Sequence, residues 1–472
     1  MLETILRRKA ESGDKTAIVY HGNNYSFSYL DDVSSRLAVH IRRLGGKRNS
    51  RITSLISDPV NYVLVFFASL KLGGTLFPIN PDLEESTIQN AIIHASPSIV
   101  IDDFKDRGQR SDALISESLD EQPLKIEQNF DSEIPVLILL TGGTTGTPKG
   151  AVISERSVLW NAFNTNMTWG ISSRDISLVS LPLFHTGGWN ILLIPTLIAG
   201  GRVVFSSTPF NESEILELIP KYNVSFFMGV PTMLEKVVNS SLFDETLLSG
   251  ITVASGGGLL PRDTIYKLRT KGARVFQGYG LTEAGPNNFY IAPERYTQKP
   301  ESVGKPCIFV ETKIATDGEL LIRGPHTFSG YLFGNDENPF DECGYLKTGD
   351  IFKTDSDGDY YFVGRKKNII KTGGENVYAA EVESALLSLD YVTDCAVIGV
   401  PDKYWGEIVV AFVSVTDERK DVDMRRDLHK FLSSYKIPKR FVILDKIPRT
   451  SVGKIDKKRL EELDEKNIHP GL

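Results

Sequence analysis

Short β-rich runs alternate with helical patterns over much of the chain, and this alternation restricts the fold more than any other feature. Apolar, β-branched runs lie at residues 52–57, 76–79, 99–101, 137–140, 202–205, 225–230, 251–254 and 274–276. Between them, residues 84–95 and 212–222 have apolar positions at helical spacing. Strands separated by helices are typical of parallel sheets, so we predict an α/β body.

The last third of the chain has a different pattern. After about residue 300, turn signals at residues 316–318, 341–344 and 355–359 separate hairpin-like pieces, which predicts a small β-rich subdomain. A compact α+β pattern follows, with helices from about residue 379 and over 424–432, and strands over 395–400, 409–415 and 440–444. A charged link at residues 365–368 separates two apolar strands. We therefore predict an N-terminal domain of residues 1–366 and a small C-terminal domain of residues 367–472.

Composition restricts the class of protein. The 472 residues, 41% of them hydrophobic, can bury a large core in at least two domains. The net charge of −7 argues against a nucleic-acid partner. The three cysteines lie far apart and the seven histidines lack metal-ligand spacing, which indicates a reducing compartment and no structural zinc. No apolar run is long enough for a bilayer span, so we expect a soluble, cytoplasmic protein, with a monomer and a homo-oligomer both open.

The strongest chemical signal is the Gly/Thr-rich segment LTGGTTGTPKG at residues 140–150. Its backbone N–H groups, its hydroxyls and Lys149 could surround the phosphates of a nucleotide triphosphate. Pro148 before the lysine and Gly150 after it depart from the common P-loop, and the residues that follow are strand-like rather than helical. The segment by itself is either a phosphate-binding loop or a Gly/Thr-rich turn.

Two acidic segments have equally open interpretations. In residues 277–283 the glycines allow a close approach to a flat base, Tyr279 offers a ring for stacking, and Glu283 is a hard oxygen ligand suited to Mg²⁺. The alternative is a tight turn with an exposed acid. Asp350 follows Thr-Gly, where its carboxylate could accept the hydroxyls of a ribose or close a turn.

Three basic segments are similarly ambiguous. The cations of residues 365–371 precede Gly373 and Gly374, and they either meet phosphates or form a solvated rim. Lys454 follows a glycine near the C-terminus, where a lysine is usually a surface charge. His185 lies among apolar and aromatic residues, which is typical of a packed core as well as of a catalytic base.

Taken together and in this order, the segments resemble the adenylate-forming superfamily, which includes acyl-CoA synthetases, luciferases and the adenylation domains of peptide synthetases. The resemblance runs from about residue 27 to residue 460 and includes residues 70–81, 229–232 and 255–261. It implies a large N-terminal adenylation domain and a mobile C-terminal domain that turns about Lys367. It also implies the reaction of a carboxylic acid with ATP and CoA, through an acyl-adenylate, to acyl-CoA, AMP and diphosphate, with Mg²⁺. Charge neutralisation and alignment should dominate that chemistry.

The resemblance assigns the nucleotide site residue by residue. The β- and γ-phosphates fall to Thr141, Thr144, Thr145 and Lys149. The adenine side of the site falls to Gly257, Gly258, Leu259, Gln277, Gly278, Tyr279 and Gly280. The ribose hydroxyls fall to Asp350, aided by Arg365.

The resemblance also assigns the catalytic residues. Glu283 is expected to bind Mg²⁺ and Thr282 the α-phosphate. Lys454 is expected to bridge the attacking carboxylate and the adenylate, a transient role that suits a point charge on a flexible stem. After the domain turns, the loop with Gly373 and Gly374 takes the place of Lys454 beside a tunnel for pantetheine.

The acid itself is less constrained. His185, a further candidate catalytic residue, stands where amino-acid-activating relatives commonly carry Asp, so an amino-acid substrate is disfavoured. His185, Trp189, Val230 and Asn288 are the candidates for a largely apolar acyl pocket. We expect a fatty acid. The alternatives are an o-succinylbenzoate- or aryl-CoA ligase, and a stand-alone adenylation enzyme that loads a carrier protein.

Overall fold

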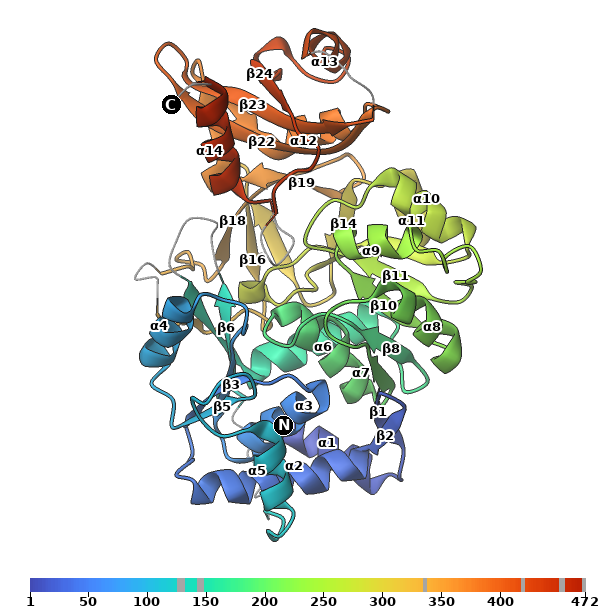
Figure 1. The fold of residues 1–472 in the computed structure, drawn as a ribbon, viewed down its shortest axis with the longest axis vertical. Coiled ribbons are helices and arrows are strands. Elements are labelled where there is room, and N and C mark those ends of the chain that lie inside the picture. The colour runs from blue at the N-terminus through green and yellow to red at the C-terminus, as the bar shows by residue number, and fades with distance from the viewer. Residues whose placement is uncertain (125–131, 142–147, 334–337, 417–420, 450–454, 469–472) are drawn as a thin grey trace. The chain divides into compact units, whose positions relative to one another are not determined.

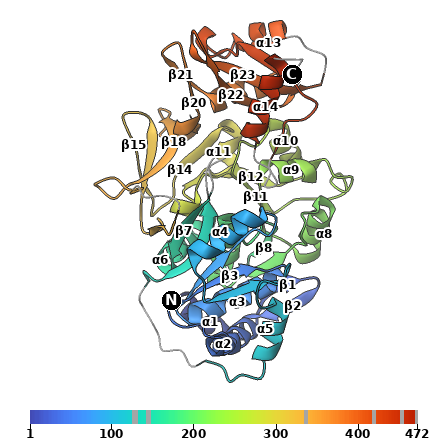
Figure 2. The ribbon, with the colours of Figure 1, turned by 60° about the vertical axis from the view of Figure 1, so that its left-hand side comes forward.

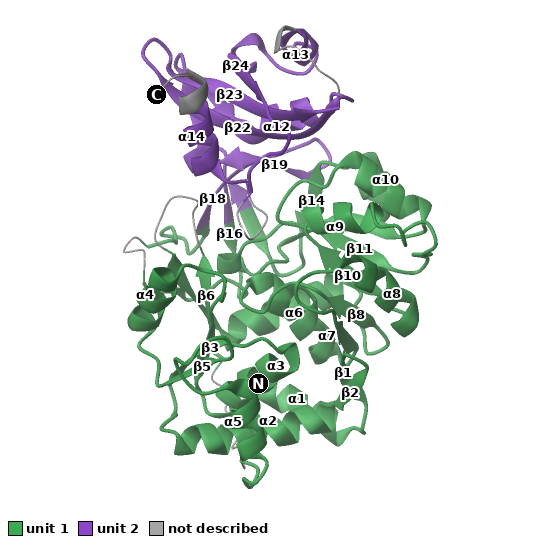
Figure 3. Cartoon of the chain, in the orientation of Figure 1, with its two compact units in different colours: residues 1–142, 147–312, 322–346 green, residues 143–146, 313–321, 347–472 purple. Residues whose placement is uncertain are grey.

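The computed structural model describes residues 1–124, 132–141, 148–333, 338–416, 421–449 and 455–468. The chain divides into two compact units, shown in different colours in Figure 3. Unit 1 comprises residues 1–142, 147–312 and 322–346, and unit 2 comprises residues 143–146, 313–321 and 347–472. The predicted α/β class is confirmed, whereas the predicted boundary between residues 366 and 367 lies inside unit 2 and stays a prediction.

One sheet of unit 1 has the strand order β12-β11-β10-β8-β9-β1-β2 (Figure 1). Its strands are β1 Thr16–Tyr20, β2 Asn23–Ser26, β8 Ile176–Val179, β9 Arg202–Phe205, β10 Phe226–Gly229, β11 Thr252–Ser255 and β12 Arg274–Gln277. Neighbours pair in parallel except in the β1–β2 hairpin. The carboxyl ends of β10, β11 and β12 therefore share one edge, where the loops that follow them meet.

The second sheet of unit 1 has the order β17-β7-β6-β4-β3-β5. Its strands are β3 Arg51–Leu55, β4 Thr75–Pro78, β5 Ile99–Asp102, β6 Pro135–Thr141, β7 Lys149–Ser154 and β17 Gly330–Tyr331. The strands β5, β3, β4 and β6 pair in parallel, and β7 is antiparallel to both β6 and β17. A strand thus follows the Gly/Thr-rich segment, as the sequence predicts, and not the helix of a P-loop.

Helices enclose both sheets of unit 1. They are α1 Leu2–Glu11, α2 Phe27–Arg43, α3 Pro59–Lys71, α4 Glu85–Ala95, α5 Ser111–Ser118, α6 Glu155–Trp169, the π-helix η1 Gly188–Leu193, α7 Ile194–Ala199, α8 Glu212–Tyr222, α9 Pro231–Val238, α10 Arg262–Thr270 and α11 Pro293–Gln298. Helix α3 is buried along nearly its whole length, because its sequence is apolar on every side. Its Tyr62 and Phe66 pack on Trp189 of η1, which joins α3 to the first sheet. No helix in the described ranges is long and apolar enough to cross a bilayer.

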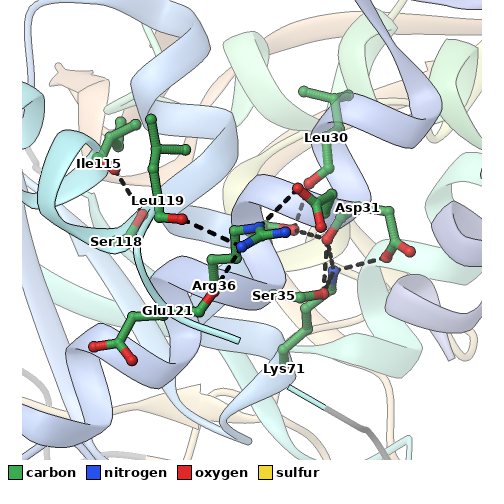
Figure 4. Close-up of polar contacts among 11 residues, drawn as sticks. Leu30, Asp31, Ser35, Arg36, Lys71, Ile115, Ser118, Leu119 and Glu121 are labelled. Carbon is green, nitrogen blue, oxygen red and sulfur yellow. Dashed lines mark hydrogen bonds and ion pairs between the residues drawn. The ribbon is translucent and has the colours of Figure 1, made fainter. Parts of the chain in front are cut away.

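Polar contacts connect α2 with α3 and α5 in unit 1 (Figure 4). The Lys71 Nζ donates hydrogen bonds to the main-chain oxygen of Asp31 at 2.6 Å, to its carboxylate at 2.7 Å and to Ser35 Oγ at 2.7 Å. The Arg36 guanidinium donates to the main-chain oxygen of Glu121 at 2.6 Å. The buried end of each cation is therefore satisfied by the protein itself.

Six further strands lie between residues 289 and 365. Strands β13 Phe289–Tyr290 and β14 Ser302–Pro306 are antiparallel in unit 1. Strands β18 Leu346–Thr354 and β19 Tyr360–Arg365 are antiparallel, with the predicted turn at residues 355–359 between them. The short strands β15 Glu311–Ile314 and β16 Glu319–Arg323 flank the predicted turn at residues 316–318. The 3-10 helix η3 Lys366–Asn368 follows β19.

Unit 2 ends in the predicted α+β fold (Figures 1 and 2). Its elements are β20 Ile369–Thr372, β21 Glu375–Tyr378, α12 Ala379–Leu387, β22 Val392–Asp402, β23 Gly406–Val415, α13 Asp421–Leu428, the 3-10 helix η4 Ser434–Lys436, β24 Arg440–Ile443 and α14 Lys457–Ile468. Alternate residues of β22 enter two cores: Cys395 and Val397 pack with α12, and Ala396 and Ile398 pack with Leu460 of α14. The sheet is thus buried on both faces.

Candidate active site

Lys149 and Glu283 of unit 1 contact the same aromatic side chain. The Tyr331 hydroxyl donates a hydrogen bond to Glu283 Oε1 at 2.8 Å, and the Lys149 Nζ lies 5.0 Å from the centroid of the Tyr331 ring. Strand pairing explains the arrangement, since Tyr331 of β17 lies opposite Ala151 of β7, the strand that begins at Lys149. Thr141, at the end of β6, lies opposite Lys149. The structure therefore brings a predicted phosphate-binding cation close to the predicted metal ligand.

The Tyr331 phenol is held in its protonated form. Partial burial raises its pKa first, and the neighbouring Glu283 carboxylate raises it further. The phenol therefore keeps its proton and donates a hydrogen bond to Glu283 Oε1. The other carboxylate oxygen, Oε2, takes no hydrogen bond from the residues that the structure describes. A half-buried carboxylate with one oriented oxygen and one available oxygen fits a ligand of Mg²⁺.

A glycine-bounded turn presents Glu283. The residue lies in the 3-10 helix η2 Thr282–Ala284, and its main-chain oxygen accepts a hydrogen bond from Phe328 N at 2.8 Å. A side chain at Gly280 would collide with the Pro286 carbonyl, since a Cβ there would lie 2.1 Å from that oxygen. Gly285 has a φ of +67°. Only glycine suits these two positions, which explains the glycines on both sides of the Thr-Glu pair.

The expected adenine loop folds over the end of β10. Gly257 has a φ of +79°, and a Cβ at that residue would lie 3.8 Å from Val230 Cγ1. A Cβ at Gly258 would lie 3.4 Å from Pro231 Cγ. The next residue, Leu259, is exposed. The structure thus brings the predicted adenine loop and the predicted pocket residue Val230 into contact.

Gln277 ties this loop to the next one. Its side-chain oxygen accepts a hydrogen bond from Leu260 N at 3.0 Å, and Gly278 N donates to Ser255 O at 2.9 Å. The main-chain oxygen of Tyr279 accepts a hydrogen bond from the main-chain N–H of Asn288 at 3.0 Å. The predicted residues Gln277, Gly278 and Tyr279 therefore lie beside the glycine loop in unit 1.

The predicted pocket residues have different environments. Trp189 is fully buried, and its indole donates to the Leu183 carbonyl. Asn288 is also fully buried, and its amide nitrogen donates to Gly285 O at 2.5 Å. His185 is half-buried, with its ring 4.9 Å from that of Phe184. Their assignment to an acyl pocket stays a prediction.

A small apolar hollow lies close to the glycine loop. Its lining includes Leu181, Gly187, Ile191 and Met228. Met228 connects it to the loop, since a Cβ at Gly256 would lie 3.3 Å from Met228 Cε. The volume of the hollow is about 10 Å³, which is the space of about one water molecule.

Unit 2 carries the predicted ribose ligand. Asp350 and Arg365 lie opposite each other on β18 and β19, with 3.3 Å between Asp350 Oδ1 and Arg365 Nε. Asp350 is buried and Arg365 is half exposed. Next to them, the Lys366 Nζ contacts Asp317 at 2.6 Å and Glu319 at 2.8 Å. These two hydrogen-bonded carboxylates raise the pKa of Lys366.

The predicted glycine loop of unit 2 lies between β20 and β21. Gly373 and Gly374 have φ values of +60° and +86°. Gly373 N donates to Trp405 O at 2.8 Å, and a Cβ at Gly373 would lie 2.8 Å from the Trp405 ring. Glycine is therefore required at residue 373 for both backbone conformation and space.

Three predicted residues lie outside the described ranges, namely Thr144, Thr145 and Lys454. The residues that flank Lys454 are described. Arg449 and Ile455 form an antiparallel bridge, and Asp456 N donates to Pro448 O at 3.0 Å. Arg449 also pairs with Asp394 at 2.9 Å.

Sequence reasoning missed Tyr331 and His326. Tyr331 belongs to a two-residue strand with no periodic signal, so only its pairing with β7 brings it to Lys149. His326 is 1% exposed, and its Nε2 lies 2.8 Å from Asn288 Oδ1. Burial, and then the nearby Arg156, lower the pKa of His326 to about 4. This neutral histidine orients a predicted pocket residue.

Comparison with known proteins agrees with this geometry. Residues 6–332 match the family model described as AMP-binding enzyme, and residues 381–454 match the AMP-binding enzyme C-terminal domain. The chain therefore belongs to the AMP-binding enzyme family, which confirms the predicted adenylate-forming superfamily. The relatives named below are CoA ligases or synthases, and the predicted enzyme class, an AMP-forming acid–thiol ligase, is confirmed as well.

Individual relatives cover the whole length of the chain. A feruloyl-CoA synthase from Amycolatopsis sp is 31% identical over 95% of this chain and 96% of its own. A 2-succinylbenzoate–CoA ligase from Listeria monocytogenes serotype 4b (strain F2365) is 29% identical over 98% of this chain and 99% of its own. The o-succinylbenzoate CoA synthetase from Bacillus subtilis, solved with the acyl-adenylate intermediate, is 28% identical, with a TM-score of 0.88 and 97% of each chain covered. The same synthetase solved with ATP and a magnesium ion has a TM-score of 0.85 and 28% identity, covering 97% of this chain and 99% of its own.

Proposed function

We propose that this chain joins an aromatic carboxylic acid to CoA, with ATP cleaved to AMP and diphosphate. The observation that carries this proposal is that Lys149 and Glu283 both contact the side chain of Tyr331. A phosphate-binding cation and a hard oxygen ligand beside a glycine-rich nucleotide loop suit ATP bound with Mg²⁺. The synthetase solved with ATP and a magnesium ion supports the same assignment.

The first step forms an acyl-adenylate. A carboxylate oxygen of the acid attacks the α-phosphorus of ATP, the new P–O bond forms, and the bond to the β-phosphate breaks to release diphosphate. Lys149 and Thr141 hold the departing phosphates, and Thr282 contacts the α-phosphate. Glu283 would hold Mg²⁺, and the ion when bound would neutralise charge on the phosphates. Asp350 holds the ribose hydroxyls and thereby orients the nucleotide.

The second step forms the thioester. The CoA thiol loses its proton and attacks the acyl carbon, so that a C–S bond forms and the C–O bond to AMP breaks. By the family resemblance, Lys454 serves the first step and the loop with Gly373 and Gly374 serves the second. Each catalytic group is needed in one step only, which makes the two assignments separable by experiment.

The names of the relatives favour an aromatic acid over the fatty acid expected from the sequence. Feruloyl and succinylbenzoate, the acyl groups in the relatives' names, both contain a benzene ring. No relative among those reported above is named for a fatty acid.

A panel of acids tests the substrate class. The purified protein is incubated with ATP, Mg²⁺ and either ferulate, o-succinylbenzoate, decanoate or phenylalanine, with and without CoA, and AMP and thioester are quantified. We expect ferulate or o-succinylbenzoate to give the highest kcat/KM, with AMP release dependent on CoA. A preference for decanoate would overturn the aromatic assignment. Adenylate formation that ignores CoA would point to a carrier-protein acceptor.

The variant Lys454→Ala tests the two-step assignment. We expect acid-dependent exchange of diphosphate into ATP to fall strongly, and thioester formation from supplied acyl-adenylate to be largely retained. Equal loss in both steps would contradict the role given to Lys454. Gly373→Ala is the matched variant for the second step, because its Cβ would collide with the Trp405 ring.

A further inference from the structure

Tyr331 is fixed relative to both charged residues that it contacts. Its strand β17 pairs with β7, with Gly330 opposite Val152 and Tyr331 opposite Ala151. Its ring packs edge-on against Phe328 at 4.9 Å between centroids. The main-chain N–H of Phe328 in turn donates to the Glu283 main-chain oxygen. One short segment therefore holds the metal-ligand turn and the phenol together.

The two contacts of Tyr331 differ in kind. Its hydroxyl makes a directional hydrogen bond to Glu283 Oε1, which fixes the carboxylate and leaves Oε2 available. Its ring attracts the Lys149 ammonium without a hydrogen bond. Within the described residues, no ion pair joins Lys149 directly to Glu283.

This separation matters for a site that binds a metal–phosphate complex. A direct pair between the ammonium and the carboxylate would neutralise both groups, and the ligand would have to break that pair before binding. A cation over a ring is held more weakly and exchanges the ring for phosphate oxygens more readily. The phenol thus leaves the Lys149 ammonium available to phosphate oxygens and the Glu283 carboxylate available to Mg²⁺.

We propose that Tyr331 is a positioning residue for metal–nucleotide binding, which orients Glu283 towards Mg²⁺ and keeps Lys149 available for the phosphates. This inference rests on the function proposed above, and it adds a residue that neither the motifs nor the resemblance assigned. Removal of a partner that orients a metal ligand typically weakens metal binding about 10- to 100-fold.

Tyr331→Phe tests the hydrogen bond alone, because the ring stays. Binding of ATP is measured by calorimetry over a series of Mg²⁺ concentrations, without acid or CoA. We expect the Mg²⁺ concentration for half-maximal ATP binding to rise about tenfold or more. Excess Mg²⁺ should restore both binding and diphosphate exchange, and the KM for the acid should stay unchanged.

Tyr391→Phe is the matched control. The Tyr391 hydroxyl donates to Asp427 Oδ2 at 2.9 Å, also in a partly buried setting, but in the C-terminal α+β part of unit 2. We expect this variant to bind ATP with the Mg²⁺ dependence of the wild type. A shift equal to that of Tyr331→Phe would overturn the proposal, because loss of any such hydrogen bond would then have the same effect.

Two further outcomes would overturn the inference. One is an unchanged Mg²⁺ dependence in Tyr331→Phe, and the other is a loss of binding that excess Mg²⁺ does not restore, accompanied by a lower Tm.

Tyr331→Leu tests the ring. We expect this variant to bind ATP more weakly even at saturating Mg²⁺. A result equal to that of Tyr331→Phe would overturn the part of the proposal that concerns Lys149. Failure of the wild type to activate any acid would refute the proposed function and not this inference, since ATP binding is measured without an acid.

Discussion

Two lysines of unit 1 have the same side chain but very different surroundings in the fold. Lys71 has 1% of its side chain exposed, and its Nζ donates to Asp31 and Ser35 (Figure 4). Burial lowers the pKa of Lys71, and the Asp31 carboxylate opposes that effect. Lys149 is half-buried and lies over the Tyr331 ring. Among the described residues it has no ion-pair partner.

The two lysines differ in how many hydrogen-bond acceptors surround the ammonium group. Lys71 has three hydrogen-bond acceptors inside the protein, so it has nothing left to offer a ligand. Among the described residues, the ammonium of Lys149 contacts only the Tyr331 ring, so phosphate oxygens could complete its hydrogen bonding. If Lys149 binds phosphate as proposed, an incomplete environment, rather than burial or charge alone, distinguishes the two lysines. The same substitution at the two positions separates the two roles.

Lys149→Met should have the largest effect, on catalysis. Loss of a cation that holds the departing phosphates should lower acid-dependent diphosphate exchange by about 10²- to 10³-fold. Its free energy of unfolding, measured by urea denaturation, should change by less than about 1 kcal/mol, because no ion pair is broken among the described residues. An exchange rate within a factor of two of the wild type would remove Lys149 from the site.

Lys71→Met should lower the stability of the fold and leave catalysis unchanged. Removal of one partner of a buried pair leaves Asp31 uncompensated, and we expect the free energy of unfolding to fall by about 3 kcal/mol. Asp31 is partly exposed, which keeps the loss at the lower end of the usual range. Activity per folded molecule should be unchanged. A catalytic defect in fully folded protein would break the comparison with Lys149.

His326 adds a third buried basic group, and its effect depends on pH. Its folded-state pKa of about 4 lies below the ordinary value of 6.5, so its neutral form stabilises the fold above pH 6.5. That contribution should be lost as the pH falls towards 4, by about 3 kcal/mol in total. The measurement is the free energy of unfolding against pH for the wild type and for His326→Gln. Parallel curves for the two proteins would contradict the lowered pKa.

Asp394→Asn should have the smallest effect and tests the role of burial. The Arg449–Asp394 pair of unit 2 is about one-third exposed on both sides, unlike the pair of Lys71. Solvent screens such a pair, so we expect the free energy of unfolding to change by less than about 1 kcal/mol. A loss as large as that of Lys71→Met would show that exposure does not separate the two pairs. Lys267→Met, which removes an exposed pair with Asp263, is the control.

Local pattern was sufficient for most of the fold. The eight predicted strands of the α/β body correspond to β3, β4, β5, β6, β9, β10, β11 and β12, because each is a short apolar run bounded by turn residues. The predicted helices at residues 84–95 and 212–222 correspond to α4 and α8. The π-helix Gly188–Leu193 was not predicted, since its apolar sequence has no periodicity that distinguishes it from an α-helix.

The candidate site was predictable only in part. Glycine requirements are local, so residues such as Gly280 and Gly373 could be recognised from their turns. The resemblance assigned Asp350 and Arg365 to the same ribose, whereas their pairing with each other depends on the register of one hairpin. The contacts of Tyr331 could not be predicted, because they join three segments far apart in the chain.

The sequence by itself determined the alternating α/β order, the backbone conformations that require glycine and the family to which the chain belongs. Each of these depends on neighbouring residues or on the order of short motifs. The tertiary structure decided which lysine is satisfied by the protein and which remains available to a ligand. Both lysines have the same chemistry, and only the packing of distant strands and helices brings Asp31 to Lys71 and an aromatic ring to Lys149.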